Sequence, residues 1–184
     1  MGAATEQLKK EHDAIGTMLR ILEVVVKKIQ DGQKVDREHL GEIVDFFRGF
    51  ADRCHHGKEE EIFFPALEKA GIPKEGGPIG VMLQEHDQMR AFMKGLAGAV
   101  ERFRGGEDGA ASEIVRHAKD YAAMLRGHID KENQVLFKMA EMHLSPEEEK
   151  ELAERFEAME TEKIGAGTHE RLHGVLERLE GIYL

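Results

Sequence analysis

Apolar residues recur at intervals of three and four along four long stretches of this chain. The stretches cover residues 8–29, 40–67, 79–103 and 114–142. Such spacing is typical of amphipathic helices that bury one face. The alternation of apolar and polar residues that is typical of strands is absent from the sequence. The pattern therefore predicts an all-α fold built on four long helices.

Helix-terminating residues separate these stretches and divide the remainder of the chain. Glycine and proline gather at residues 31–32, 71–78 and 105–109. Ser145 and Pro146 combine a helix N-cap with a proline suited to the first helical position, and acidic residues follow. This predicts a fifth helix over about residues 146–160, and Gly165 and Gly167 introduce a sixth. We expect residues 1–144 to form a four-helix bundle and residues 145–184 a helical extension packed on it.

The chain contains an internal repeat that joins two short motifs. Residues 55–59 and 128–132 both read His-x-x-Lys-Glu, and residues 11–13 and 85–87 both read Glu-His-Asp. Each second copy lies 73 or 74 positions after the first, and the flanking residues also match. The bundle is therefore predicted to consist of two related halves.

The repeated residues have the chemistry of metal ligands. Residues four apart lie on one face of a helix, so each His-x-x-x-Glu presents an imidazole and a carboxylate together. Two histidines per ion and two bridging glutamates would give each ion four protein ligands, and an oxide or hydroxide bridge would leave one position open. Iron, manganese and zinc accept such mixed ligands, and buried glutamates would balance their charge. The predicted ligands are His12, His55, Glu59, His86, His128 and Glu132.

These motifs resemble the hemerythrin-like, or HHE cation-binding, family. The resemblance covers roughly residues 4–143 and includes the acidic pair and the Phe-Pro segment of residues 59–65. It implies an up-down four-helix bundle with a non-haem di-iron centre bridged by oxide or hydroxide. Respiratory hemerythrins carry a further histidine where this chain has Arg90, and an aspartate one residue beyond the position of Glu132. The chain is thus similar to the symmetric four-His, two-Glu branch, which includes nitric-oxide-responsive and iron-sulfur repair proteins.

The resemblance implies a function in binding or reacting with small oxidants such as dioxygen, peroxide or nitric oxide. Sensing, detoxification, iron-centre repair and other stress responses would all use that chemistry, and whether the protein is an enzyme stays open. A non-enzymatic iron store or carrier is one alternative. A regulatory bundle that is merely stabilised by metal is another. Manganese and zinc remain alternatives to iron.

His56 and Glu60 are also four residues apart and would make an equally good ligand pair. The repeat favours His55, because pairing His56 with His128 would break the matching Lys-Glu and Phe positions. His56 and Glu60 point about 100° away around the helix. We therefore assign ligation to His55.

Arg90 and Tyr121 are the other residues that could reach the site. Arg90 follows His86 by one helical turn, so an inward orientation would add a cation beside the carboxylates. Tyr121 precedes His128 by seven residues, on the same helical face, and either packs in the core or donates a hydrogen bond in the site.

Residues 169–173 match the H-E-x-x-H motif of zinc peptidases. Glu177 and Glu180 are the only later acidic residues that could complete such a site, and they lie on the same short helix. We therefore expect His169 and His173 to be solvated or to serve in packing. The nine methionines have helical spacing that fits flexible core filling.

Composition limits the class of protein and its partners. The 184 residues suit one soluble domain, and a formal charge of −10 argues against nucleic acid or an anionic membrane as partner. No apolar run is long enough to span a bilayer and no signal-peptide core is evident, so we expect a cytoplasmic protein. Cys54 is the only cysteine, which excludes an internal disulfide, and we expect it to be a small buried side chain.

The helical extension over residues 145–184 either caps the bundle or forms a homodimer contact.

Overall fold

The computed structural model describes residues 2–165 and 167–184, and the described residues contain helices and no strand. The first helix of the bundle is α1 (Ala3–Gln30) and the third is α4 (Pro78–Arg104). The second runs without a break through α2 (Arg37–Phe46), η1 (Phe47–His56), η2 (Glu59–Phe63) and α3 (Phe64–Lys69). The fourth runs through α5 (Ala111–Lys131), η4 (Glu132–Leu136) and α6 (Phe137–His143), after the short 3-10 turn η3 (Asp108–Ala110). The all-α prediction with four long helices is confirmed.

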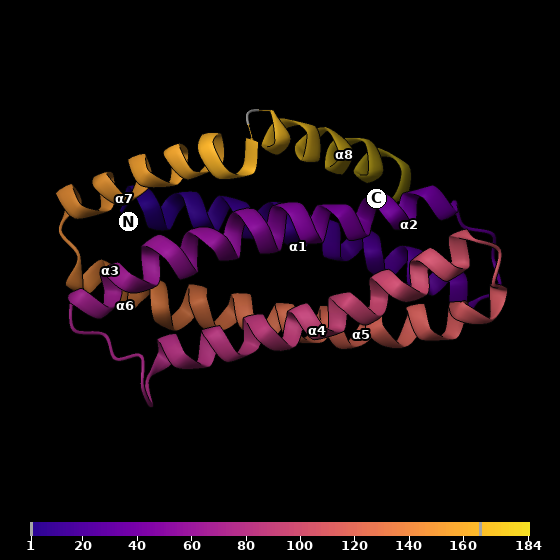
Figure 1. Ribbon diagram of the computed structural model, residues 1–184, viewed down its shortest axis with the longest axis horizontal. Helices are drawn as coiled ribbons and strands as arrows, with labels where there is room; N and C mark the ends of the chain where they lie inside the picture. Colours follow the sequence, from indigo (N-terminus) through magenta and orange to yellow (C-terminus); the bar gives the residue numbers. More distant parts are fainter. Residues whose placement is uncertain (1, 166) are drawn as a thin grey trace.

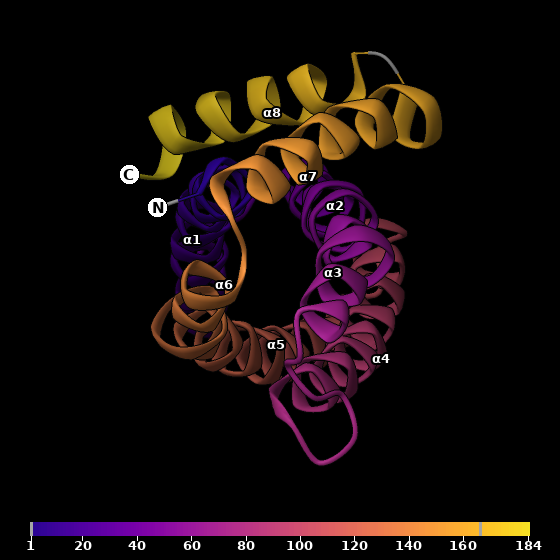
Figure 2. The same cartoon turned by 90° about the vertical axis from the view of Figure 1, so that its left-hand side faces the viewer.

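The four long helices surround a common axis, and the C-terminal segment lies across one side of them. Figure 2 shows the four helices end-on as a ring, with α7 and α8 outside it. The outer helices are α7 (Pro146–Met159) and α8 (Thr168–Tyr183), and the π-helical turn η5 (Glu160–Gly165) follows α7. Both outer helices contact α1, and α8 also contacts α2 (Figure 1). The extension therefore covers the first two helices of the bundle.

The fifth helix begins as its sequence predicts. The Ser145 side chain accepts a hydrogen bond from the backbone N–H of Glu148, whose carboxylate accepts one from the backbone N–H of Ser145. Pro146 occupies the first turn, where its missing N–H costs nothing. This capping box fixes where the chain turns from the bundle into the extension.

The buried apolar residues form two clusters with a polar layer between them. In α1, Leu8 belongs to one cluster and Ile15 to the other, and His12 lies between them. In α4, Met82 and Met89 flank His86 in the same way. The extension contributes to both clusters. Helix α7 adds Leu152, Phe156 and Met159 to one cluster, and α8 adds Leu172, Leu176 and Leu179 to the other. The polar layer is thus enclosed by hydrocarbon on both sides.

Candidate metal centre

The two helices that carry His-x-x-x-Glu contain π-helical turns that include residues of that motif. His55 lies in the last turn of the π-helical η1, and Glu59 and Glu132 begin the π-helical η2 and η4. The helices α1 and α4, which each contribute a single histidine, remain α-helical throughout. Wide π-helical turns are rare and occur frequently at functional sites. The π-helical turns therefore include predicted ligand positions in both halves.

Four predicted histidines meet as two pairs of matching geometry. His12 Nε2 lies 3.0 Å from His55 Nε2, and their ring planes are inclined at 62°. His86 Nε2 lies 3.1 Å from His128 Nε2, with an inclination of 60°. All four side chains are buried. The repeat seen in the sequence is thus a repeat in space.

The two predicted glutamates connect these pairs. Glu59 places Oε1 3.5 Å from His55 Nε2 and Oε2 3.4 Å from His86 Nε2. Glu132 places Oε2 3.1 Å from His12 Nε2 and 3.4 Å from His128 Nε2. Each carboxylate therefore touches one histidine of each pair, which is the position of a ligand shared between two ions. The structure brings all six predicted residues together.

Every histidine of the two pairs has an oxygen partner on its outer nitrogen. The partners of Nδ1 are Asn133 Oδ1 for His12 at 3.0 Å, Glu11 Oε2 for His55 at 2.8 Å, Glu60 Oε1 for His86 at 2.7 Å and Glu85 Oε2 for His128 at 3.0 Å. Because each Nδ1–H donates outward, a neutral ring presents the lone pair of Nε2 to the interior. Metal-binding histidines are commonly oriented in this way.

The interior of the centre fits a pair of cations. Two lone pairs only 3.0–3.1 Å apart repel each other unless a positive charge lies between them. The carboxylate oxygens of Glu59 and Glu132 are fully buried and accept no hydrogen bond from the described residues. Burial raises the pKa of Glu132, but positive charge on the His128 and His12 rings outweighs burial and lowers this pKa well below its ordinary value, so the carboxylate is stabilised by positive charge in the interior. Nitrogen and carboxylate donors suit iron, manganese or zinc.

A lysine supports the outer carboxylate in each half. Lys58 Nζ lies 2.5 Å from Glu11 Oε1, and Lys131 contacts Glu85 in the corresponding way. Burial raises the pKa of Glu11, but hydrogen bonding to His55 and the charge of Lys58 lower it to about 2. The outer carboxylate is therefore ionised. The repeat contained these residues, since they complete its Glu-His and Lys-Glu elements, but the sequence alone did not assign their role.

His56 lies beside the centre with a different geometry. Its ring is nearly parallel to that of His86, with an interplanar angle of 17° and 3.9 Å between centroids. One of its nitrogens lies within 4.8 Å of ligand atoms from Glu59, His86 and His128. When two histidines bind the same metal ion, the binding nitrogen of each ring points at the ion, and the two rings do not stack face to face. The ring orientation therefore distinguishes His56 from the four paired histidines.

Arg90 and the histidines of α8 serve other contacts. Arg90 forms ion pairs with Glu60 at 2.7 Å and Asp52 at 2.8 Å. His169 and His173 pack against the Phe50 ring, with centroids 5.0 and 5.2 Å away, in agreement with the expected packing role. Glu170, the catalytic position of an H-E-x-x-H motif, is exposed. Cys54 is buried, as expected, with its sulfur 3.9 Å from His169 Nδ1.

The fold and the site together define a helical bundle with buried clusters of histidine and glutamate that could hold metal. Residues 3–140 match the family described as hemerythrin HHE cation binding domain, and the chain belongs to that family. The uncharacterized proteins Rv1995 of Mycobacterium tuberculosis and Mb2018 of Mycobacterium bovis are each 26% identical to it over 183 residues. These alignments cover 98% of this chain and 71% of each relative. Among the described residues, no helix has the length and apolarity needed to cross a bilayer.

Proposed function

We propose that this protein holds a non-haem di-iron centre and uses it to bind or react with small oxidants such as dioxygen, peroxide or nitric oxide. Four inward-facing imidazole nitrogens and two buried carboxylates without hydrogen-bond donors among the described residues carry this proposal. Bound iron would supply an open coordination position and electrons for such a ligand. The same chemistry would serve sensing, detoxification or iron-centre repair.

The chain's own residues would divide the work between two ions. His12 and His55 would hold one ion and His86 and His128 the other. Glu59 and Glu132 would be shared, because each carboxylate already lies within 3.5 Å of a histidine from both pairs. The acceptors on Nδ1 would keep the rings oriented, and the two apolar clusters would exclude water.

The outer layer is rich in negative charge. The carboxylates of Glu11, Glu60 and Glu85 all accept from Nδ1 of a ligand histidine. Negative charge around bound ions favours their more positive, oxidised state, and an imidazole ligand becomes more basic when its Nδ1–H donates a hydrogen bond to a carboxylate. Such surroundings support a centre that gives electrons to an oxidant.

Burial of the ligands favours a resident centre over a store that releases iron readily. The six side chains are between 0% and 4% exposed, so release of an ion requires the bundle to open. A carrier would exchange its iron with a chelator within seconds, whereas a resident centre would retain it for hours. This difference separates the two functions experimentally.

The test is metal content per chain in protein purified without air, followed by the optical spectrum after dioxygen is added. We expect about two irons in the wild type, loss of iron in His55→Ala and in His128→Ala, and an absorption typical of an oxo-bridged pair. His143→Ala is the matched control, because His143 is exposed and its Nδ1 bonds the backbone oxygen of Met139. A wild type without metal, or ligand variants that keep both ions, would refute the proposal.

A further inference from the structure

A cavity of about 300 Å³ lies beside His56. Its apolar walls come from three elements of the bundle, with Phe47 in η1, Met89 and Met93 in α4 and Tyr121 in α5. A water molecule occupies about 30 Å³ in the liquid, so the cavity is much larger than a diatomic gas or hydrogen peroxide requires. Its volume falls at the lower end of pockets that hold small organic molecules.

Two buried polar side chains line this cavity, and one of them lacks a hydrogen-bond partner within the described part of the chain. His56 lines it and is 2% exposed, and neither of its ring nitrogens has a hydrogen-bond partner among the described residues. Its Nδ1 lies 3.4 Å from Asp52 Oδ1, so Nε2 is the nitrogen left without a polar contact from Asp52. Tyr121 also lines the cavity and is 2% exposed, and its hydroxyl is a hydrogen-bond donor and acceptor. Burying a polar group such as the His56 ring without a partner costs stability. A ligand with an oxygen at its end would provide that partner and would also reach the Tyr121 hydroxyl.

His56 connects this cavity to the candidate metal centre. Its ring stacks on His86 and lies 5.6 Å from the ring of His128, at an angle of 77°. The other half of the repeat has no such group, since Ile129 occupies the position equivalent to His56. The cavity therefore approaches the His86 and His128 pair through His56.

We propose that the cavity binds a small alkyl or aryl hydroperoxide, with its peroxide end at His56 and Tyr121 and its hydrocarbon body against Phe47, Met89 and Met93. The Tyr121 hydroxyl would donate to a peroxide oxygen, and the terminal O–H of the ligand would donate to an unprotonated nitrogen of His56. This inference deepens the proposed function, on which it rests, by naming an organic peroxide as the oxidant.

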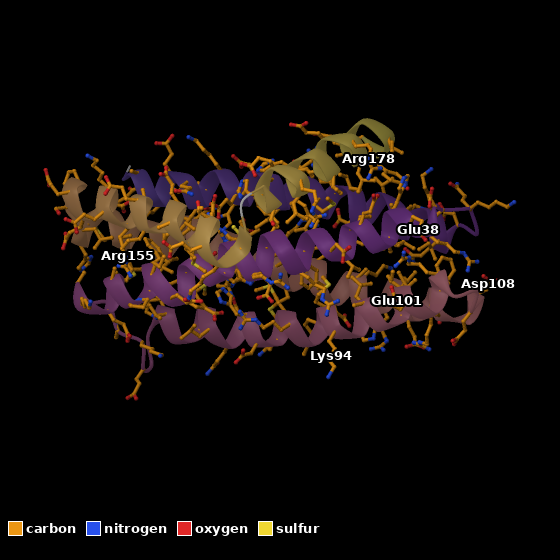
Figure 3. The ribbon with its side chains drawn as sticks, turned by 45° about the horizontal axis from the view of Figure 1, so that its top comes forward. Glu38, Lys94, Glu101, Asp108, Arg155 and Arg178 are labelled. Carbon is orange, nitrogen blue, oxygen red and sulfur yellow. The ribbon has the colours of Figure 1, made fainter. Side chains whose placement is uncertain are left out.

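The charged residues around the cavity leave its interior suited to an uncharged ligand. Asp52 is neutralised by its ion pair with Arg90, at 2.8 Å. Arg48 and Lys94 line the cavity but are exposed, and Lys94 extends away from the helices (Figure 3). The cations therefore belong to the mouth, while apolar side chains and two neutral hydrogen-bonding groups form the interior.

The cavity can be tested by binding, without any reaction, through the alcohol that corresponds to cumene hydroperoxide. We would titrate this alcohol into the purified metal-containing protein and measure its dissociation constant by ligand-observed NMR. Tyr121→Phe and His56→Leu each remove one hydrogen bond, so we expect binding about three- to tenfold weaker in each. Met93→Trp fills the cavity and should abolish binding. Tyr183→Phe is the matched control, because the other tyrosine of the chain bonds His39 instead and should leave binding unchanged.

Two results would overturn the inference. The first is that the Tyr121→Phe and Met93→Trp variants bind the alcohol with the same affinity as the wild type. The other is binding of butyrate without binding of the alcohol, which would mean that the cations at the mouth select an anion. Iron content and reaction with hydrogen peroxide are measured on the same samples, so failure of the di-iron proposal is recognised separately from failure of the cavity.

Discussion

The two halves of the repeat build the inner layer of the candidate metal centre alike and its outer layer differently. The Nε2 atoms of the paired histidines are 3.0 Å apart in the first half and 3.1 Å apart in the second. Outside them, the first half has a lysine that is 0% exposed, Lys58, where the second has Lys131, which is 44% exposed. The repeat therefore fixes the donor atoms, while the surroundings of each half are free to specialise.

One difference is the cover that the extension provides. Lys58 lies between Glu11 of the bundle and Glu160 of η5, and its Nζ is 5.8 Å from the centre of the Phe156 ring in α7. Lys131 contacts Glu85, and its side chain remains partly open to water. The extension thus seals the first half and ties it, through Lys58 and Glu11, to the ring of His55.

The other difference is the charge carried by the acceptors on Nδ1. His86 bonds the carboxylate of Glu60, whereas His12 bonds the amide oxygen of Asn133, at the equivalent position of the repeat. Glu60 is held in turn by Arg90. A carboxylate partner makes an imidazole a stronger metal ligand than an amide does. We expect two bound ions to differ, although their inner ligands match.

Removing metal should have the largest effect and should test whether the halves share one centre. At a free concentration 1,000 times its dissociation constant, each ion adds about 4 kcal/mol to the free energy of unfolding. Chelation should therefore lower the melting temperature by roughly 15 °C or more. Hydrogen exchange should accelerate around residues 55–59 and 128–132 together, because both glutamates contact both histidine pairs. Acceleration in only one half would mean that the ions are held independently.

Replacing the two equivalent lysines should reveal the effect of the cover. Lys58→Met would remove the cation that pairs with Glu11 and Glu160, and the buried carboxylate of Glu11 would lose its charge partner. We therefore expect a loss of about 3 kcal/mol in the free energy of unfolding. Lys131→Met removes a partly exposed ion pair and should cost less than about 1 kcal/mol. Urea denaturation of the metal-loaded proteins measures both losses. Equal losses would show that the extension does not seal the first half.

The sequence predicted the inner layer because that layer depends on local rules. The i, i+4 spacing and the internal repeat are visible without a structure, and they selected His55 over His56, which the matching ring geometries of the two pairs also favour. The cover and the cavity depend instead on distant contacts. Lys58 and Glu160 are 102 residues apart, and the cavity is lined by side chains of three separate elements. No periodic pattern encodes such packing.

Removing the charge of Glu60 should weaken one ion more than the other. Glu60→Gln keeps an oxygen for His86 Nδ1 but removes the carboxylate charge, so we expect about a tenfold larger dissociation constant for the ion of the second pair. Competition with a coloured chelator should then show two phases of metal release. Glu61→Gln is the control, because Glu61 pairs with Lys163 on the surface. Release in a single phase at the wild-type rate would contradict the expected difference between the ions.

Removing the charge of Glu160 should have the smallest effect and asks what the extension contributes to the first half. In Glu160→Gln, Lys58 keeps its ion pair with Glu11, and the apolar contacts of Phe156 and Met159 remain. We therefore expect a loss of about 1 kcal/mol in the free energy of unfolding, measured by urea denaturation. Glu157→Gln, one turn earlier and exposed, should be neutral. If Glu160→Gln also leaves the free energy of unfolding unchanged, then the extension stabilises the first half through apolar burial alone. The burial of Lys58 would then not depend on its ion pair with Glu160.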